Sequence, residues 1–563
     1  MVFPCVDCNE DDQIKCTRKD IKMIIKKSIP FIIVLLFLHW SQSMAVEKIS
    51  AEREKAPYKL LYNNDTTNVL SCNSPFHKKG ESFTEAKLVA SIEETAGKGV
   101  DCHLLSPGMG WVPWWQSKVE PGYIEWWEKR TGLNVENEGS GYMKYIHNGG
   151  DMVQVLIDTC RKHDMAPFVS LRLNDVHLQE RYREKDFWSM VSCRFYCEHP
   201  QWHIDPEHYK RDGYYGKRGM DWAVPEVRAY KLKLIQELAD NYDLAGLELD
   251  FLRHSQLFRD NGPSPDKRIK IITGFVARVR KALDKKGGKR KWLCVRIPLD
   301  LSAHPPLGLD VTKLYAAGVD MFNLSCWYDT TQNTDAGNVR RMLPEAAIYV
   351  EMTHTTGRNP HFHKNRSYGT APKPRACDQQ YYTTARIAYE RGADGMSLFN
   401  FVYFRMFREG VVEYREPPFH VLPNLSDPDF LKNQPPYYWL ASASYENQLP
   451  RTLRMGRTEG FQLEMLPLEK NTILHLRVHT KEVIGDSDIT VTFNGKRLKP
   501  VSNVSAFYEN PFDTMISPNE KYRKGWELPG SIIKNGRNTV TTKLENGKPL
   551  TLFWIDAGKA VQD

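Results

Sequence analysis

Polar and apolar side chains alternate in the stretch Leu244–His254 near the middle of the chain. In an extended strand neighbouring side chains point to opposite faces, so Glu248 and Asp250 share one face and the intervening leucines take the other. Two carboxylates on one face repel each other, and a half-buried strand has no structural need for that pair. The stretch is therefore interpreted as an active-site strand. The structural alternative is a surface strand whose carboxylates pair with Arg253 and its neighbours.

Eight predicted strands alternate with helix-spaced segments before residue 407. The strands are Lys59–Asn63, Val100–Ser106, Ala166–Asn174, Leu244–Leu252, Trp292–Leu299, Met321–Trp327, Ala347–Thr353 and Gly395–Phe401. Strict alternation implies parallel pairing through right-handed crossovers, and eight such units close a barrel. The pattern thus predicts an α/β fold with a (β/α)8 TIM barrel over residues 57–416. A doubly wound open sheet is the competing architecture, but the first strand is not followed by a glycine-rich phosphate loop.

The pattern changes after residue 416. Proline pairs at Pro417-Pro418 and Pro435-Pro436 bracket a predicted linker, residues 417–436. Short alternating strands then follow, with turns such as Asn494-Gly495, and predict a C-terminal β-sandwich domain over residues 437–563. The sandwich either binds carbohydrate or packs against the barrel. Packing is favoured, because the sequence shows no exposed aromatic platform.

The N-terminus has the pattern of a targeting segment. Lysines precede the apolar run Ile29–Trp40, and Ser43-Met44-Ala45 has the small-x-small form of a cleavage site, so residues 1–45 are predicted to be a signal peptide. Met23 opens a conventional signal peptide, which suggests a mis-start upstream of it. The apolar run is too short for a stable membrane anchor, and a secreted or periplasmic protein is expected. The net charge of +8 is spread along the chain, so no nucleic-acid partner is inferred.

Eight cysteines follow the predicted signal peptide, most of them single within strand or helix patterns. Buried free thiols are the expected state for those. The run from Cys193 and Cys197 to His199 and His203 has a passing resemblance to a zinc site, but its spacing fits no strong template. One or two disulfides in this region of an exported protein are the favoured alternative.

The candidate chemistry lies at the strand ends. The carboxyl ends of the strands in such a barrel meet their loops at one mouth, where active sites are built. Polar side chains end six consecutive strands here, and a barrel built for stability alone would fill most of these positions with branched apolar residues. The expected mouth residues are Ser170, Arg172, Asn174, Asp175, His177, Glu248, Asp250, Arg253, His254, Arg296, Asp300, Asn323, Ser325, Trp327, Glu351, His354 and Asn400.

Two separated carboxylates are what cleavage of a glycosidic bond needs. Asp250 is predicted to act as nucleophile or base and Glu351 as general acid, with the roles open to exchange. Glu248, one pleat deeper, would tune a pKa or hold a sugar hydroxyl. Considered one at a time, Arg172 and Arg296 could serve only to neutralise these carboxylates.

Residues 59–407 resemble the glycoside-hydrolase-like (β/α)8 barrel proteins of bacterial exported polysaccharide-degradation systems. The motifs that carry the resemblance are Ser170–His177, Trp222–Arg228 and Gly246–His254. The last motif is also similar to the strand-four motif of the alpha-amylase family, and that resemblance implies a nucleophile at Asp250. Glu248 stands where that family has an arginine, so starch is not implied as the substrate.

The leading hypothesis is an exported glycoside hydrolase that cleaves a poly- or oligosaccharide without a cofactor or metal. Trp114, Trp115 and Trp327 are expected to stack on sugar rings. The arginines at the mouth either recognise acidic or sulfated sugars or only balance the carboxylates. Two alternatives remain: a non-catalytic carbohydrate-binding barrel, and a metal-dependent hydrolase that uses His177, His254 and His354.

Overall fold

The structure is a computed structural model. It describes residues 54–109, 111–177, 193–207, 215–361, 374–405, 416–442, 447–502, 507 and 519–560. The predicted signal peptide, residues 1–45, lies outside these ranges. No helix in the described ranges is both long and apolar enough to cross a membrane.

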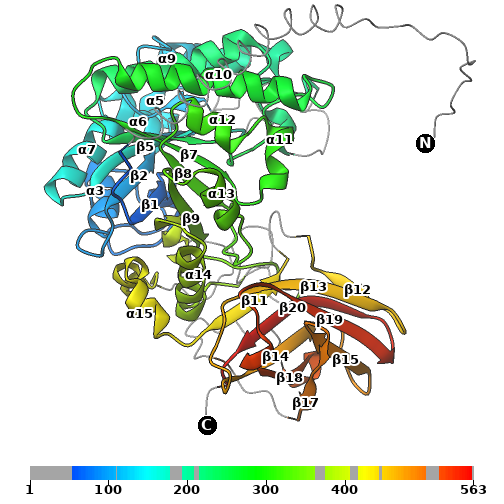
Figure 1. Ribbon diagram of the computed structural model, residues 1–563. Coiled ribbons are helices and arrows are strands. Elements are labelled where there is room, and N and C mark those ends of the chain that lie inside the picture. The colour runs from blue at the N-terminus through cyan, green and yellow to red at the C-terminus, as the bar shows by residue number, and fades with distance from the viewer. Residues whose placement is uncertain are drawn as a thin grey trace, which may run out of the picture. The chain divides into compact units, whose positions relative to one another are not determined.

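Eight parallel strands close into a barrel (Figure 1). They are β1 (Leu60–Asp65), β2 (Cys102–Ser106), β5 (Ala166–Arg172), β6 (Gly246–Asp250), β7 (Trp292–Pro298), β8 (Met321–Ser325), β9 (Ala347–Thr353) and β10 (Gly395–Phe399). Each strand pairs with the next in chain order, and β10 closes on β1. The predicted TIM barrel is thereby confirmed.

Helices follow the strands and cover the barrel. They are α2 (Asn68–Ser71), α3 (Glu85–Glu93), α4 (Tyr123–Thr131), α5 (Val135–Glu138), α6 (Gly141–His147), α7 (Met152–Lys162), α8 (Arg194–Glu198), α9 (Pro225–Asn241), α10 (Pro265–Asp284), α11 (His304–Leu307), α12 (Val311–Ala316), α13 (Ala336–Met342) and α14 (Asp378–Glu390). Short 3-10 turns join some of them: η2 (Pro200–Trp202), η4 (Tyr215–Arg218), η5 (Leu301–Ala303) and η7 (Phe401–Arg405).

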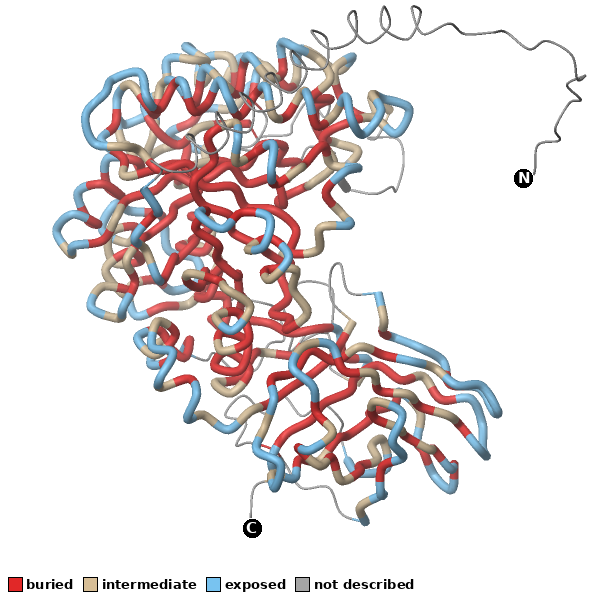
Figure 2. The backbone as a smooth tube through the Cα atoms, in the orientation of Figure 1, coloured by how far each residue is buried: buried red, intermediate tan, exposed pale blue. Residues whose placement is uncertain are grey.

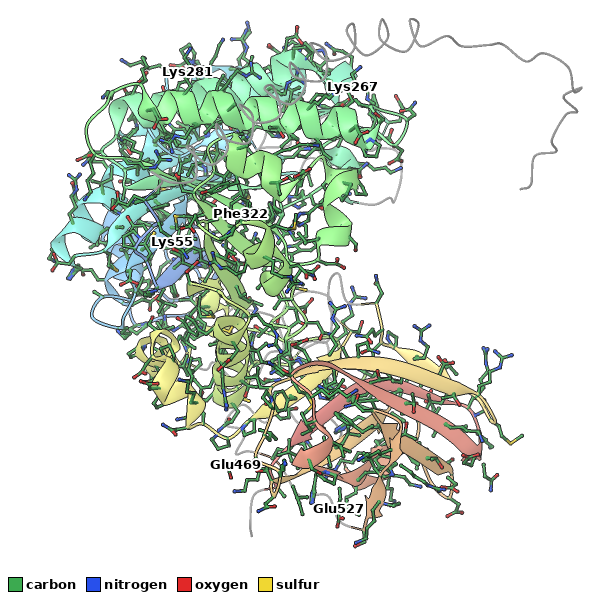
Figure 3. The ribbon with its side chains drawn as sticks, in the orientation of Figure 1. Lys55, Lys267, Lys281, Phe322, Glu469 and Glu527 are labelled. Atoms are coloured by element: carbon green, nitrogen blue, oxygen red, sulfur yellow. The ribbon has the colours of Figure 1, made fainter. Side chains whose placement is uncertain are left out.

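The barrel strands are buried along almost their whole length (Figure 2). Helix α10 shows how the outer layer is attached: it begins at Pro265 and buries Phe275 and Val276, while Lys267 and Lys281 are exposed (Figure 3). Phe322 of β8, fully buried, lies on the inner side of that layer. Burial on both faces is what a parallel barrel requires, and it makes every polar residue inside the barrel conspicuous.

Strand register places polar residues of neighbouring strands at the same level. Ser170 pairs with Glu248, and Arg172 pairs with Asp250, between β5 and β6. Asp250 in turn pairs with Arg296 between β6 and β7. Because these positions are level, the side chains that point inward from adjacent strands meet each other at the carboxyl end of the barrel.

The C-terminal part forms two antiparallel sheets, which confirms the predicted β-sandwich. One sheet has the order β11-β20-β14-β18-β17 with β12 beside β20, and the other has the order β13-β19-β15-β16. Their bounds are β11 (Tyr437–Ala441), β12 (Arg451–Leu453), β13 (Thr458–Met465), β14 (Ile473–Thr480), β15 (Asp488–Phe493), β16 (Lys496–Arg497), β17 (Lys499–Val501), β18 (Arg523–Pro529), β19 (Gly536–Asn546) and β20 (Leu550–Gly558), with turns η9 (Glu520–Tyr522) and η10 (Gly530–Ile532). Leu476, Val491 and Val540 are among the residues of the core between the sheets.

Residues 417–436, expected to be a linker, are helical and packed. They form η8 (Phe419–Ser426) and α15 (Pro428–Lys432), and Leu422 and Leu431 are buried in the core of the barrel. Pro418 is the N-cap of η8, Pro423 lies inside it and Pro428 starts α15, while apolar residues between them pack inward. Barrel and sandwich are accordingly parts of one compact unit, Ala56–Asp563.

All eight cysteines in the described residues are free thiols, so the prediction of one or two disulfides is wrong. The Cys193 thiol instead caps α8, where it accepts a hydrogen bond from the Tyr196 amide at 3.4 Å. His199 stacks on Trp202 and His203 stacks on Tyr196, with ring centroids 3.8 and 4.1 Å apart. These stacked rings form no ligand cluster with the cysteines, because the one candidate metal-binding group in the described residues lies elsewhere.

Candidate active site

The polar residues at the carboxyl end of the barrel form two networks. The inner network consists of Asn63, Ser170, Glu248, Asp250, Arg296, Asn323, Ser325 and Glu351. The outer network consists of Asp65, Arg172, Asp175, His177, Arg253, His254 and Asn400. Most of the predicted mouth residues therefore do come together.

Arg296 is the centre of the inner network, and its side chain is fully buried. Its Nη1 donates to Asp250 Oδ2 at 3.1 Å, and its Nε donates to Glu351 Oε2 at 2.9 Å. The guanidinium also lies over the Phe399 ring, 4.0 Å from the centroid. Burial opposes the charge, yet Glu351 and Asp250 raise the pKa of Arg296, which remains a cation. One guanidinium thus holds the two carboxylates predicted to be catalytic.

Glu248 lies one pleat deeper and is enclosed. Its Oε1 accepts hydrogen bonds from Asn63 Nδ2 at 2.6 Å and Ser170 Oγ at 2.7 Å. Burial, and after it the charge of Asp250, raise the pKa of Glu248 to about 7. A carboxyl group that can hold a proton at neutral pH therefore lies beneath the Asp250–Arg296 pair.

Asn323 connects Glu248 to Glu351. Its Nδ2 donates to Glu248 Oε2 at 3.1 Å and to Glu351 Oε2 at 3.0 Å. Because one amide group serves both carboxyl groups, a change of charge on Glu248 is felt directly at Glu351.

Asp250 also shapes the loop that follows its strand. Its Oδ1 accepts hydrogen bonds from the amides of Leu252 and Arg253, both at 2.9 Å. The next residue, His254, has a left-handed φ of 59°. The carboxylate therefore fixes the turn that delivers Arg253 and His254 to the outer network.

Arg172 joins two carboxylates of the outer network. It lies 2.7 Å from Asp65 and 3.0 Å from Asp175. Burial alone would raise the pKa of Asp65, but Arg172 and Arg253 hold it at about 2. The Asp65 carboxylate is consequently ionised throughout the physiological range.

Asp175, His177 and His254 form the cluster that could hold a metal ion, with candidate ligand atoms within 4.8 Å of one another. Burial lowers the pKa of both histidines, so their rings are neutral. However, Arg172 contacts Asp175 and Arg253 contacts His177. Two arginine cations oppose a divalent ion here, and the arrangement is better described as a hydrogen-bonded cluster.

Trp327 and Tyr328 provide aromatic surface at the mouth. The Arg253 guanidinium lies over both rings, at 5.6 Å and 5.1 Å from their centroids. Trp327 is partly exposed and has a left-handed φ of 59°. Non-glycine residues rarely adopt this conformation. Of the five in the described residues, His254, Trp327 and Asn400 follow β6, β8 and β10, and Asp164 and Asn494 lie elsewhere.

Trp114 and Trp115 do not form part of the mouth, contrary to the prediction. They are only 1% and 2% exposed. The Trp114 ring stacks on Tyr142 at 4.4 Å, and Trp115 Nε1 donates to Glu237 at 2.8 Å. The loop folds back through β3 (Gly108–Met109) and β4 (Val112–Pro113), and both rings belong to the core of the barrel.

Asn174 and His354 are structural residues, which corrects two further predictions. The Asn174 amide donates to the Met220 and Gln256 carbonyls at 3.1 and 2.8 Å, and so ties two loops together. The His354 ring is fully buried beside Tyr403. Both side chains are buried and contact neighbouring parts of the fold.

Asp300 and Asn400 also differ from expectation. Asp300 caps η5 by accepting from the Ser302 amide at 2.8 Å, and takes no part in either network. Asn400 is fully buried, and its Oδ1 accepts from the Asp65 amide at 3.0 Å. It therefore helps to position Asp65.

Two residues of the networks, Asn63 and Asp65, were not predicted from the sequence. They belong to β1, whose predicted end at Asn63 omitted Asp65. The signal was present in the polar run Asn63-Asn64-Asp65, which ends the first strand in the same way as polar residues end the later ones.

Comparisons with known proteins give distant matches to solved structures. No protein-family model and no curated protein matches the chain. A maltogenic alpha-amylase, AmyB from Thermotoga neapolitana, matches with 13% identity and a TM-score of 0.36 over 90% of this chain and 99% of its own. A class V chitinase from Pseudomonas fluorescens Pf-5 matches with 12% identity and a TM-score of 0.33 over 65% and 99%, and endo-glycoceramidase II from Rhodococcus sp. with 12% and 0.35 over 86% and 97%.

Proposed function

We propose that the chain is a glycoside hydrolase in which Asp250 is the nucleophile or base and Glu351 is the general acid. The observation that carries the proposal is the convergence of these two carboxylates, from β6 and β9, on the single cation Arg296. The convergence lies at the carboxyl end of the barrel strands, where enzymes of this fold build their active sites. Export through the predicted signal peptide belongs to the same proposal.

The division of labour follows from the environments of the carboxyl groups. Glycosidic cleavage needs one group that protonates the leaving oxygen and one that attacks the sugar or activates water. The amides after β6 and Arg296 orient Asp250. Glu248, whose pKa is raised to about 7, changes the charge near Glu351 through Asn323. Glu248 would thus adjust the electrostatic environment of Glu351.

The substrate is proposed to be a poly- or oligosaccharide, with the Trp327 face as the stacking surface for a sugar ring. Arg172 is paired with Asp65 and Asp175, and Arg296 with Asp250 and Glu351. Because both arginines are paired with carboxylates, we propose that they balance these charges and do not recognise acidic or sulfated sugars.

Product analysis on a panel of plant, algal and host glycans tests the proposal. The wild type should release shorter sugars from at least one glycan, and Asp250→Asn and Glu351→Gln should each lower that release at least about a hundredfold. Undiminished turnover in both variants would refute the assignment of the site.

A non-catalytic carbohydrate-binding barrel is the second candidate. The observation that favours it is the enclosure of the carboxylates, since Asp250 and Glu351 are 2% and 3% exposed and both are paired with Arg296. A wild type that binds glycans on an array but releases no product from any of them would select this candidate over the hydrolase.

A further inference from the structure

A second polar feature lies at the same end of the barrel, on the side of β7 and β8. It is a pocket of about 580 Å³ between the loops that follow these strands and the edge of the sandwich domain. The barrel contributes Asp300, Ser302 and Asp335, and the sandwich contributes Gln448, Arg451 and Arg537. A volume of this size falls within the range of sites for small ligands.

A backbone hydrogen bond connects the pocket's lining to the end of β8, which carries Ser325 of the inner network. Leu299, which lines the pocket, donates its amide hydrogen to the Ser325 carbonyl at 3.0 Å, and the Ser325 hydroxyl contacts Glu351. Asp335 holds the same loop by accepting from the Leu301 amide at 2.9 Å. The pocket is therefore built on the loops that follow β7 and β8, two strands that carry residues of the inner network.

The lining carries no net charge, because it contains two carboxylates, Asp300 and Asp335, and two guanidinium groups, Arg451 and Arg537. Hydroxyl and amide groups complete the surface. A mixture of donors and acceptors without net charge suits a neutral ligand rich in hydroxyl groups, and excludes a strongly charged one.

The two arginines of the pocket are available to a ligand. Arg537 approaches Asp335 only to 3.8 Å and its side chain is 61% exposed. Arg451 approaches Glu459 only to 3.8 Å and its side chain is 49% exposed. Exposed ion pairs at this distance contribute little to stability, so the fold does not account for the presence of these two residues at the pocket.

We infer that this pocket binds neutral sugar residues of a polysaccharide chain that extends from the active-site mouth, so that the sandwich domain forms part of the substrate-binding surface. This inference rests on the proposed function. The substrate would be a neutral polysaccharide long enough to reach from the mouth into the pocket.

Affinity electrophoresis of the full chain tests the inference. Native gels would contain soluble starch, glycol chitin, xylan or laminarin, and would be run in the cold. At least one polymer should retard the wild type, and Arg451→Ala/Arg537→Ala should raise the dissociation constant about tenfold or more. Ser302→Trp, which fills the pocket from the barrel side without changing charge, should do the same.

Arg454→Ala/Arg497→Ala is the matched control, because both arginines are exposed on the sandwich and neither lines the pocket. It should leave retardation unchanged. Unaltered retardation of both pocket variants would overturn the inference, as would a wild type retarded by none of the polymers. Hydrolysis by the wild type reports separately on the proposed function, since the gel measures binding alone.

Discussion

Arg296 is the residue on which the inner network depends. It is fully buried between Asp250 and Glu351 and lies over Phe399. Removal of one partner from a buried ion cluster leaves uncompensated charge in a medium of low dielectric constant. Without the Arg296 cation, burial of the two ionised carboxylates would be strongly unfavourable.

Arg296→Met should lower the free energy of unfolding by about 3–5 kcal/mol, because two buried carboxylates lose their cation. Denaturant unfolding followed by fluorescence measures the loss. Arg161→Met is the matched control, since the Arg161–Asp243 pair is exposed and should contribute at most about 1 kcal/mol. Equal effects of the two substitutions would contradict the account.

Glu248 gives the stability of the protein a defined pH dependence. Its pKa is about 7 in the folded chain against an ordinary value of 4.5. The folded state binds this proton more tightly than the unfolded state, so the contribution is present below about pH 4.5 and is lost as pH rises toward and past 7. At about 1.4 kcal/mol for each pH unit, the contribution amounts to about 3 kcal/mol.

Glu248→Gln removes this titration. The unfolding free energy of the wild type minus that of the variant should be greater at pH 5 than at pH 8, by up to about 3 kcal/mol. Denaturant unfolding of both proteins at the two pH values measures it. A difference that is the same at both values would show that Glu248 does not titrate in this range.

At the scale of elements, strand ends and loops divide the aromatic residues between two tasks. The loop with β3 and β4 buries its tryptophans, whereas the turn after β8 presents Trp327 at the mouth. The two kinds of tryptophan should therefore respond differently to truncation.

Trp114→Ala should lower the free energy of unfolding by about 3–5 kcal/mol, because it opens a large cavity beside Tyr142. Trp327→Ala should cost less stability and should raise KM for the glycan found by product analysis. Thermal unfolding and steady-state kinetics of both variants provide the comparison. A raised KM in Trp114→Ala at unchanged stability would instead support the original prediction that Trp114 stacks on a sugar ring.

At the scale of the whole molecule, the barrel and the sandwich share contacts. The side-chain Nε2 of Gln332 donates to the Tyr437 carbonyl at 2.9 Å, and its Oε1 accepts from the backbone amide of Trp439 at 3.0 Å. Ile387 of α14 belongs to the core of the sandwich. Arg391, the C-cap of that helix, donates from its Nε to Glu464 at 2.8 Å.

A chain that ends at residue 436 should consequently melt at a lower temperature or fail to accumulate in soluble form, since it exposes Ile387 and leaves Gln332 without its partners. A chain that begins at residue 54 serves as control and should keep the melting temperature of the full chain. A stable, soluble barrel without residues 437–563 would contradict this description.

Much of this architecture is readable in the sequence, because alternating strands and helices leave few topologies and strand ends must meet at one mouth. Glu248 and Asp250 could be placed by their spacing alone. The burial of Trp114, the use of Asn174 to tie loops and the capping by Cys193 could not, since each depends on where a loop folds back. Arg296 could be predicted at the mouth, but its role as the bridge between two carboxylates needed the three-dimensional register.

The most direct test of the central claim is steady-state turnover of Asp250→Asn on the glycan that the wild type cleaves. The control is Asp243→Asn, at an exposed carboxylate just before the same strand. The account predicts a loss of kcat of about a hundredfold or more for Asp250→Asn with glycan binding retained, and no change for Asp243→Asn. A kcat of Asp250→Asn within tenfold of the wild type would contradict it.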